Sequence, residues 1–204
     1  MQKFTKKDVD IEAVTPRYQG FLSTYSYRLR HRLFAGGWTQ PIDRELMERG
    51  NAVVVLPYDP KRDEIVLLEQ FRVGALRTSD TPWLLEFVAG MVEDKDDSIE
   101  AVAHRELHEE AGLTAQRLVP ALSYLSSPGG MSERVHVYVG IVDTSQAADF
   151  AGLDDENEDI RVHVLARREV ESLLADGKID NAASVIALQW LQLHRQQLSV
   201  LSET

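Results

Sequence analysis

Two glutamates, Glu106 and Glu110, stand four residues apart in a segment whose apolar residues recur with a helical period. The stretch from Asp97 to Ala111 is predicted to be a helix, with Asp97 as its N-cap and Gly112 as its C-terminal stop. On this helix the two glutamates continue an inward-facing stripe formed by Ile99, Val102 and Ala103. Like charges at this spacing repel, and burying an unpaired carboxylate is costly. We therefore expect a cation beside them.

A hard divalent cation suits this need, because Mg²⁺ binds carboxylate, water and phosphate oxygens. The net charge of −11 repels anions unless a bound cation reverses the field locally. Two options follow: the chain has no anionic substrate, or it receives one through a metal. The same charge argues against a nucleic-acid partner. The alternative is a solvated helix, on which Arg105 and Glu109 form an ordinary ion pair.

The surrounding elements alternate between strands and helices, which favours an α/β or α+β layered domain. A small N-terminal β unit is expected over residues 1–50, followed by a main domain over 51–204. Strands are predicted within 8–34 and at 51–58, 64–73, 84–89, 118–125, 134–142 and 160–165, and helices at 168–175 and 182–197. Gly90 is expected to end the strand at 84–89.

The composition excludes several other classes of protein. There are no cysteines, so disulfides and thiolate metal sites are excluded. The first ten residues lack the apolar core of a secretory signal, and the longest apolar run, Ala52 to Pro57, is too short to cross a membrane. We expect a cytoplasmic protein without a membrane partner.

The run from Gly90 to Leu113, GMVEDKDDSIEAVAHRELHEEAGL, resembles the Nudix box. That motif reads Gly, five residues, Glu, seven residues, then Arg-Glu-apolar-x-Glu-Glu-x-Gly-apolar. Residues Arg105 to Leu113 match its second half fully. In the first half six residues follow Gly90, and Asp97 stands where the family has Glu, which lengthens the loop before the helix.

The resemblance implies a Nudix α-β-α sandwich with a mixed sheet, and hydrolysis of a nucleoside diphosphate linked to another group. It implies Mg²⁺ as the cofactor, with Mn²⁺ as a substitute. By position in the motif, the metal ligands would be Glu106, Glu109, Glu110 and the carbonyl of Ala89. Arg105 would orient the glutamates.

Within the family, the chain is similar to the ADP-ribose pyrophosphatase subgroup. Pro128 lies 16 residues after Gly112, as in that subgroup, and the N-terminal β unit resembles its dimerisation domain, which implies a homodimer. The acidic loop 154–160 resembles the loop that supplies the catalytic base. Glu156 would then be the base and Glu158 a further metal ligand, although the two roles could be exchanged. The alternative is a solvated charge run.

Five further residues resemble substrate-binding residues of the subgroup. Arg72 would bind phosphate through its fork of donors. Phe21, Arg44 and Glu45 would bind adenosine, and Ser127 would contact the ribose. The alternatives are an interface or core aromatic for Phe21, a helix-surface charge for Arg44, and an ordinary turn serine for Ser127.

The resulting hypothesis is hydrolysis of ADP-ribose to AMP and ribose 5-phosphate. Three alternatives stay open from the sequence: another substrate such as a GDP-sugar or NADH, a nucleotide-sensing module without catalysis, and a structural acidic helix. The sequence does not give the number of metal ions.

Overall fold

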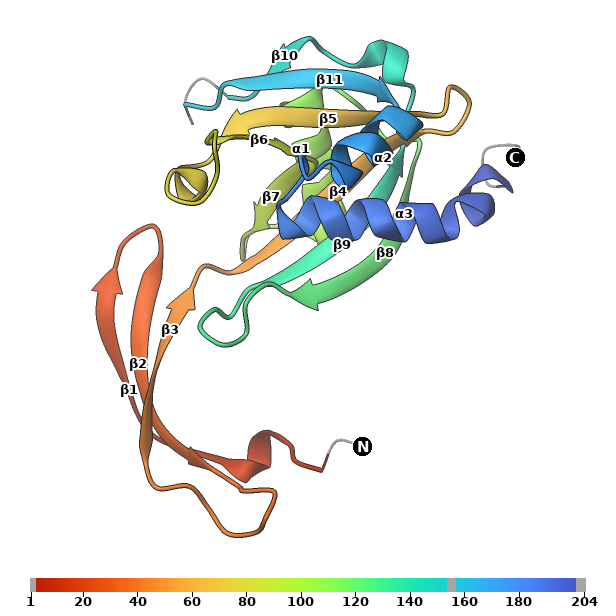
Figure 1. Cartoon of the computed structure of the whole chain (residues 1–204). Coiled ribbons are helices and arrows are strands. Elements are labelled where there is room, and N and C mark those ends of the chain that lie inside the picture. Colours follow the sequence, from red (N-terminus) through yellow and green to blue (C-terminus); the bar gives the residue numbers. More distant parts are fainter. Residues whose placement is uncertain (1–2, 154–156, 201–204) are drawn as a thin grey trace. The chain divides into compact units, whose positions relative to one another are not determined.

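The structure is a computed structural model that describes residues 3–153 and 157–200. The chain divides into two compact units (Figure 1). The first unit comprises residues 1–50 and 125–134, and the second comprises residues 51–124 and 135–204.

The first unit is a three-stranded antiparallel sheet in the order β1-β2-β3, within the described residues. Its elements are the 3-10 turn η1 (Lys6–Asp8) and the strands β1 (Val9–Gln19), β2 (Ser23–His31) and β3 (Ile42–Glu48). The segment 125–134 joins β3 by two main-chain hydrogen bonds. Met47 N–H donates to Gly130 O at 2.8 Å, and Ser132 N–H donates to Met47 O at 3.1 Å.

Strand β3 corrects one sequence-based alternative. A helix-surface position for Arg44 is wrong, because Arg44 lies on β3 opposite Tyr27 of β2. The segment around it is rich in helix-forming residues, but cross-strand contacts override that weak preference. One of them is the ion pair between Arg28 and Asp43, at 3.0 Å.

The second unit is built on a mixed sheet in the order β10-β11-β5-β4-β9-β8, in which β6 also pairs with β5 and β7 with β4. Strands β4 and β9 are parallel. The pairs β10–β11, β11–β5, β4–β5, β4–β7 and β5–β6 are antiparallel. The strands are β4 (Asn51–Asp59), β5 (Glu64–Phe71), β6 (Trp83–Glu86), β7 (Val88–Val92), β8 (Arg117–Leu125), β9 (Arg134–Ile141), β10 (Phe150–Ala151) and β11 (Ile160–Ala166). The 3-10 turns are η2 (Val73–Ala75) and η3 (Thr144–Gln146).

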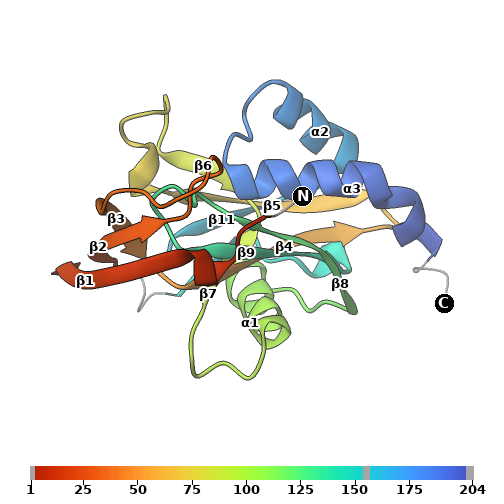
Figure 2. The same cartoon turned by 90° about the horizontal axis from the view of Figure 1, so that it is seen from below.

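Helices cover both faces of this sheet (Figure 2). Helix α1 (Ile99–Ala111) lies on one face, and α2 (Arg167–Ala175) and α3 (Ala182–Val200) lie on the other. Alternate side chains of β4 point to opposite faces of the sheet, as the two-residue period of a strand requires. Val53 and Val55 pack in the core under α1, whereas Val54 and Leu56 pack in the core under α2 and α3. The predicted α-β-α sandwich is confirmed.

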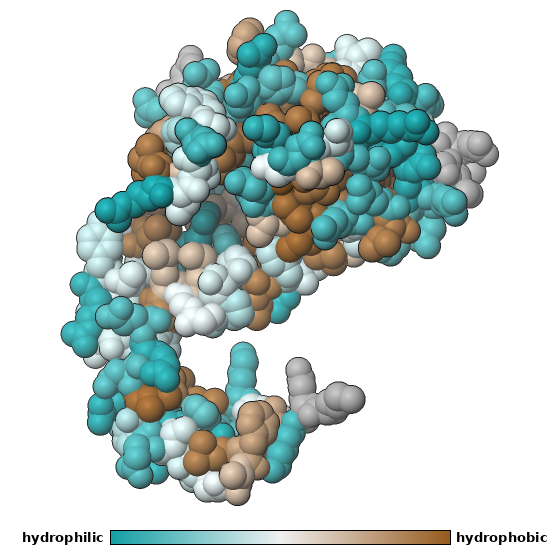
Figure 3. All heavy atoms as spheres, in the orientation of Figure 1, coloured by the Kyte–Doolittle hydropathy of each residue, from teal (hydrophilic) through white to brown (hydrophobic). Residues whose placement is uncertain are grey.

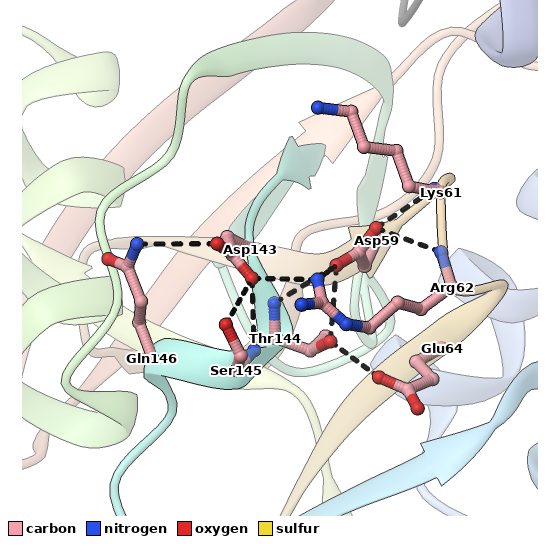
Figure 4. Close-up of polar contacts among 8 residues, drawn as sticks. All are labelled: Asp59, Lys61, Arg62, Glu64, Asp143, Thr144, Ser145 and Gln146. Carbon is pink, nitrogen blue, oxygen red and sulfur yellow. Dashed lines mark hydrogen bonds and ion pairs between the residues drawn. The ribbon is translucent and has the colours of Figure 1, made fainter.

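A polar network closes the turn between β4 and β5 (Figure 4). The buried carboxylate of Asp59 accepts hydrogen bonds from the main-chain N–H groups of Arg62 and Thr144, at 3.1 and 3.2 Å, and from Lys61 N–H at 2.9 Å. Burial opposes ionisation of Asp59, but the hydrogen bonds from Thr144 and Arg62 outweigh it and hold its pKa below the ordinary value. The network therefore fixes the predicted turn and ties η3 to it.

The strand predicted at 84–89 is two strands, β6 and β7, and the expected end at Gly90 is wrong. Strand β7 runs on to Val92 because Gly90 pairs with Val53 of β4. None of the helices in the described residues is both long and apolar enough to cross a membrane.

Candidate active site

Helix α1 carries the glutamates that were predicted to bind metal, and both of its ends are capped. The predicted N-cap at Asp97 is wrong by one residue, because the Ser98 hydroxyl accepts the hydrogen bond from Ala101 N–H at 3.1 Å. Gly112 ends the helix as predicted, in the left-handed conformation (φ 67°). Its N–H donates to His108 O at 2.9 Å.

Glu110 is the most deeply buried carboxylate of this helix, with 2% of its surface exposed. Its Oε2 accepts a hydrogen bond of 2.8 Å from the main-chain N–H of Ala89 on β7. Burial, followed by the negative charges of Glu106 and Glu158, raises the pKa of Glu110 to about 8. The hydrogen bond from Ala89 and the charge of Arg72 act in the opposite direction. The helix thus presents a desolvated carboxylate to the main chain at Ala89.

Glu106 lies one turn before Glu110 and packs against Gly90. A Cβ atom at Gly90 would collide with the Glu106 side chain, so any other residue here would force the Glu106 carboxylate to move. Burial raises the pKa of Glu106 to about 7, although the charge of Arg105 lowers it. The expected stripe is confirmed in the sense that Val102, Ala103 and Glu110 are buried and Glu106 is partly buried.

Arg105 contacts two of the three glutamates. Its Nη2 lies 2.8 Å from Glu106 Oε1, and its Nη1 donates to Glu109 Oε2 at 2.7 Å. The ordinary ion pair with Glu109 therefore exists, and the same guanidinium also reaches Glu106. Arg105 supplies positive charge between the two carboxylates.

Arg72 follows β5 and is also in the second unit. Its Nε donates to Glu86 Oε2 of β6 at 2.8 Å, and its positive charge lowers the pKa of Glu110. Glu86 was missed from the sequence. A single acidic residue within the apolar run Trp83–Val92 was the available signal, because a buried carboxylate requires a partner.

The acidic loop is described in part. Glu156, the predicted base, lies outside the described residues. Glu158 is partly buried, its N–H donates to Leu153 O at 3.2 Å, and its charge raises the pKa of both Glu106 and Glu110. The structure therefore brings Glu158 into electrostatic contact with the glutamates of α1.

The other predicted substrate residues belong to the first unit. Phe21 is 85% exposed, so it is not a core residue of this chain. Ser127 lies in a turn, where its carbonyl accepts hydrogen bonds from Gly130 N–H at 3.1 Å and Met131 N–H at 2.9 Å. Glu45, on β3 beside Arg44, lines a pocket of about 350 Å³ within this unit. Its other lining residues are Arg17, Thr24, Tyr25, Leu46, Met47 and Gly130.

The donor set in the second unit suits a hard cation, since it consists of carboxylate oxygens beside the main chain of Ala89 and Gly90. Two of the carboxylates, Glu106 and Glu109, are turned toward Arg105. Accordingly, no group of three acidic or histidine side chains in the described part of the chain is already arranged as a metal-binding set. A metal ion bound here would share these carboxylates with Arg105, which contacts both.

Comparisons with known proteins identify the family of the chain. Residues 48–194 match the model of the NUDIX domain family. The chain is 57% identical to an ADP-ribose pyrophosphatase of Escherichia coli (strain K12), over 96% of this chain and 93% of that protein. It is 45% identical to an ADP-ribose pyrophosphatase of Haemophilus influenzae, over 97% of this chain and 92% of that protein.

Two further matches have lower sequence identity. A GDP-mannose pyrophosphatase of Yersinia pestis is 32% identical over 74% of this chain and 75% of that protein. A crystal structure titled as an ADP compounds hydrolase has the same fold, with a TM-score of 0.72 at 21% identity, over 96% of this chain and 98% of that one. The resemblance seen between Gly90 and Leu113 is confirmed, and the chain belongs to the NUDIX domain family.

Proposed function

We propose that this chain hydrolyses the diphosphate linkage of ADP-ribose to AMP and ribose 5-phosphate. The observation that carries the proposal is the pair of glutamates on α1, desolvated against Ala89 and Gly90. Sequence identities of 57% and 45% to two ADP-ribose pyrophosphatases, over nearly the whole chain, support the choice of substrate.

Nudix pyrophosphatases are generally metal-dependent, and Mg²⁺ is the proposed ion, with Mn²⁺ as a substitute. Glu106, Glu109, Glu110, Glu158 and the carbonyl of Ala89 are the proposed ligands. A bound divalent cation would lower the pKa of an attacking water and offset charge on the diphosphate. Ionised carboxylates are needed for this, and the raised pKa values of Glu106 and Glu110 describe the protein before a cation offsets their charge.

The protein's own residues would perform the remaining tasks. Glu156 or Glu158 would accept the proton of the attacking water as the general base. Arg105 would hold Glu106 and Glu109 in position through the two ion pairs described above. Arg72 has its Nε engaged by Glu86, which leaves its two Nη groups to bind oxygens of the diphosphate.

The adenosine-binding roles of Phe21, Arg44 and Glu45, the ribose contact of Ser127, and the homodimer belong to the same proposal. Support for the dimer comes from the first unit, which exposes large apolar side chains that an isolated chain rarely exposes together. The cytoplasmic location and the absence of nucleic-acid and membrane partners stay predictions.

Product analysis tests the proposal directly. The protein is incubated with ADP-ribose and Mg²⁺, and the products are separated by anion-exchange chromatography. AMP and ribose 5-phosphate in equal amounts are expected, and chelation of the metal should stop their formation. Binding of ADP-ribose without product would indicate a nucleotide-sensing module instead.

Parallel incubations with GDP-mannose and NADH separate the alternative substrates. The more distant similarity to a GDP-mannose pyrophosphatase makes GDP-mannose the sharper comparison. A higher kcat/KM for either compound than for ADP-ribose would replace the proposed substrate while keeping the reaction class.

A further inference from the structure

The carbonyl groups at the end of α1 show what holds this helix to the acidic loop. The last four carbonyls of a helix have no partner within the helix and need one elsewhere. Two groups near the end of α1 are bonded locally: His108 O accepts from Gly112 N–H, and Leu107 O accepts from Leu113 N–H. Two others are bonded by a remote segment: Ala148 N–H donates to Ala111 O at 3.1 Å, and Gly152 N–H donates to Glu109 O at 3.2 Å.

Of these two hydrogen bonds to α1, the one from Gly152 lies nearer to the acidic loop along the chain. It directly follows β10, which pairs with β11 as Ala151 opposite Ile160. Glu158 stands two residues before β11. Gly152 and Glu158 therefore lie near the two ends of the connection between β10 and β11. Gly152 thus joins the helix of the glutamates to the loop that carries Glu158.

The conformation at Gly152 excludes other residues for two separate reasons. Its φ of +100° is one that residues with a Cβ rarely adopt. A Cβ here would also lie 2.7 Å from the carbonyl oxygen of Glu158 and 2.9 Å from the Glu158 Cβ. Both distances are shorter than van der Waals contact, so the backbone of Glu158 would have to move away.

We propose that Gly152 is a positioning residue for Glu158. Its N–H holds the chain just after β10 against Glu109 of α1, and its lack of a side chain leaves the space into which the Glu158 backbone fits. The placement of Glu158 relative to Glu106 and Glu110 then depends on a glycine outside the Nudix box. This inference rests on the proposed function, because it assigns Glu158 a role as metal ligand or base.

The test begins with Gly152→Ala, compared with Gly36→Ala as a matched control. Gly36 has a nearly identical φ of +98°, but no atom lies within 4 Å of where its Cβ would be. We expect Gly152→Ala to lower kcat for ADP-ribose by about tenfold to a hundredfold, since small displacements of a catalytic group have effects of that order. KM should change by less than about twofold, because Arg72 is untouched. Gly36→Ala should keep wild-type kcat.

A double-mutant cycle shows whether Gly152 acts through Glu158. On the background of Glu158→Gln, the Gly152→Ala substitution should lower kcat by less than about twofold, because the group it positions is already impaired. Independent effects that multiply, or an unchanged kcat in Gly152→Ala, would overturn the proposal. Asn tolerates positive φ better than Ala, so Gly152→Asn replaces Gly152→Ala in the cycle if the latter does not fold. Loss of folding in both variants would assign Gly152 to the fold alone and overturn its positioning role.

Mn²⁺ binding to the substrate-free protein, measured by calorimetry, gives a readout that does not require turnover. Weaker binding in Gly152→Ala, with wild-type binding in Gly36→Ala, is expected if Glu158 is displaced from a metal site. Equal Mn²⁺ affinity in all three proteins, together with unchanged kcat, would overturn the inference. Absence of AMP in the wild-type reaction would instead refute the proposed function, so the two failures are distinguishable.

Discussion

The two units bury their side chains very differently. The second unit has an apolar core on each face of its sheet, and the carboxylates of α1 are held at the edge of one of them. In the first unit, among described residues 3–50, only Ser26 is buried. Its exposed apolar side chains include Ile11, Val14, Tyr18, Phe21 and Phe34. Figure 3 shows hydrophobic residues, coloured brown, at the surface of the molecule. The second unit therefore has buried apolar cores, whereas the first exposes apolar side chains that the proposed dimer would bury.

Ion pairs on the strands of the first unit differ in the same way from the glutamates of α1. In the first unit, Arg30 pairs with Asp10 at 2.7 Å and Arg28 pairs with Asp43, all partly exposed, and such pairs contribute about 1 kcal/mol or less. In the second unit, Glu106 and Glu110 are desolvated and their pKa values are raised. Strongly shifted pKa values are typical of functional sites. The buried carboxylates therefore favour the second unit as the place of the proposed chemistry.

The largest effect is expected from Glu110→Gln. The amide keeps the size of the side chain and can still accept from Ala89 N–H, but it cannot ionise to bind a cation. We expect kcat to fall by about a thousandfold or more, as for loss of a major charge-stabilising group. The midpoint of thermal unfolding should stay the same or rise, because a buried ionisable group is removed.

Glu100→Gln is the matched control for Glu110→Gln, since Glu100 lies on the exposed side of the same helix. Its kcat should remain within about twofold of wild type. Near-normal turnover of Glu110→Gln at saturating Mg²⁺ would show that the chemistry does not depend on the buried carboxylate of the second unit.

The second prediction concerns the pH dependence of stability without metal. Glu106 and Glu110 have folded pKa values of about 7 and about 8, above the ordinary value of 4.5. Between these values the folded state binds more protons than the unfolded state, so the free energy of unfolding must fall as pH rises. We expect a loss of several kcal/mol between about pH 5 and pH 9, measured by denaturant unfolding in a chelator.

Two further measurements assign this pH dependence to the site. Mg²⁺ should reduce the loss at high pH, because it binds the ionised carboxylates. Glu110→Gln should show a shallower decline than wild type, because one of the two titrating groups is gone. Equal slopes in the two proteins would place the titration elsewhere in the molecule.

The part of the site that depends on local spacing was predictable from the sequence. The inward stripe on α1 follows from the helical period, and Gly112 is a strong helix stop, so both could be identified without a fold. The alternation along β4, and hence the two cores, follows in the same way. These features depend on residues close together in the chain.

The features that depend on remote contacts could not be predicted. Strand β3 forms because β2 offers a partner, and Gly90 continues a strand because it pairs with Val53. The role of Glu86 depends on the hydrogen bond that it accepts from Arg72. The requirement for glycine at position 152 depends on the close approach of Glu158. The N-cap was misplaced by one residue because Asp97 and Ser98 are both good caps, and only the hydrogen bond to Ala101 distinguishes them.

Arg72→Ala tests the substrate-binding side of the second unit. We expect KM for ADP-ribose to rise by about tenfold to a hundredfold, because a charge-assisted fork of donors to the diphosphate is lost. Arg72→Lys should give a smaller increase, since Lys keeps the charge but not the fork. Arg77→Ala removes an exposed charge from the same segment and should leave KM unchanged. An unchanged kcat/KM in Arg72→Ala would contradict the assignment.

The smallest effect is expected from Phe21→Ala, which tests whether the first unit contributes to the site. Phe21 is 85% exposed, so its truncation should not shift the midpoint of thermal unfolding. If it stacks on adenine, KM should rise by about twofold to tenfold, in line with the strength of aromatic pairs. Phe21→Tyr should keep the wild-type KM, because it retains the ring. Phe34→Ala serves as the control, since Phe34 is similarly exposed at 82% but was not predicted to bind substrate. Equal KM values in wild type, Phe21→Ala and Phe34→Ala would confine substrate binding to the second unit. The exposed apolar side chains of the first unit would then serve association between chains alone. Sedimentation equilibrium of the same variants would measure that association.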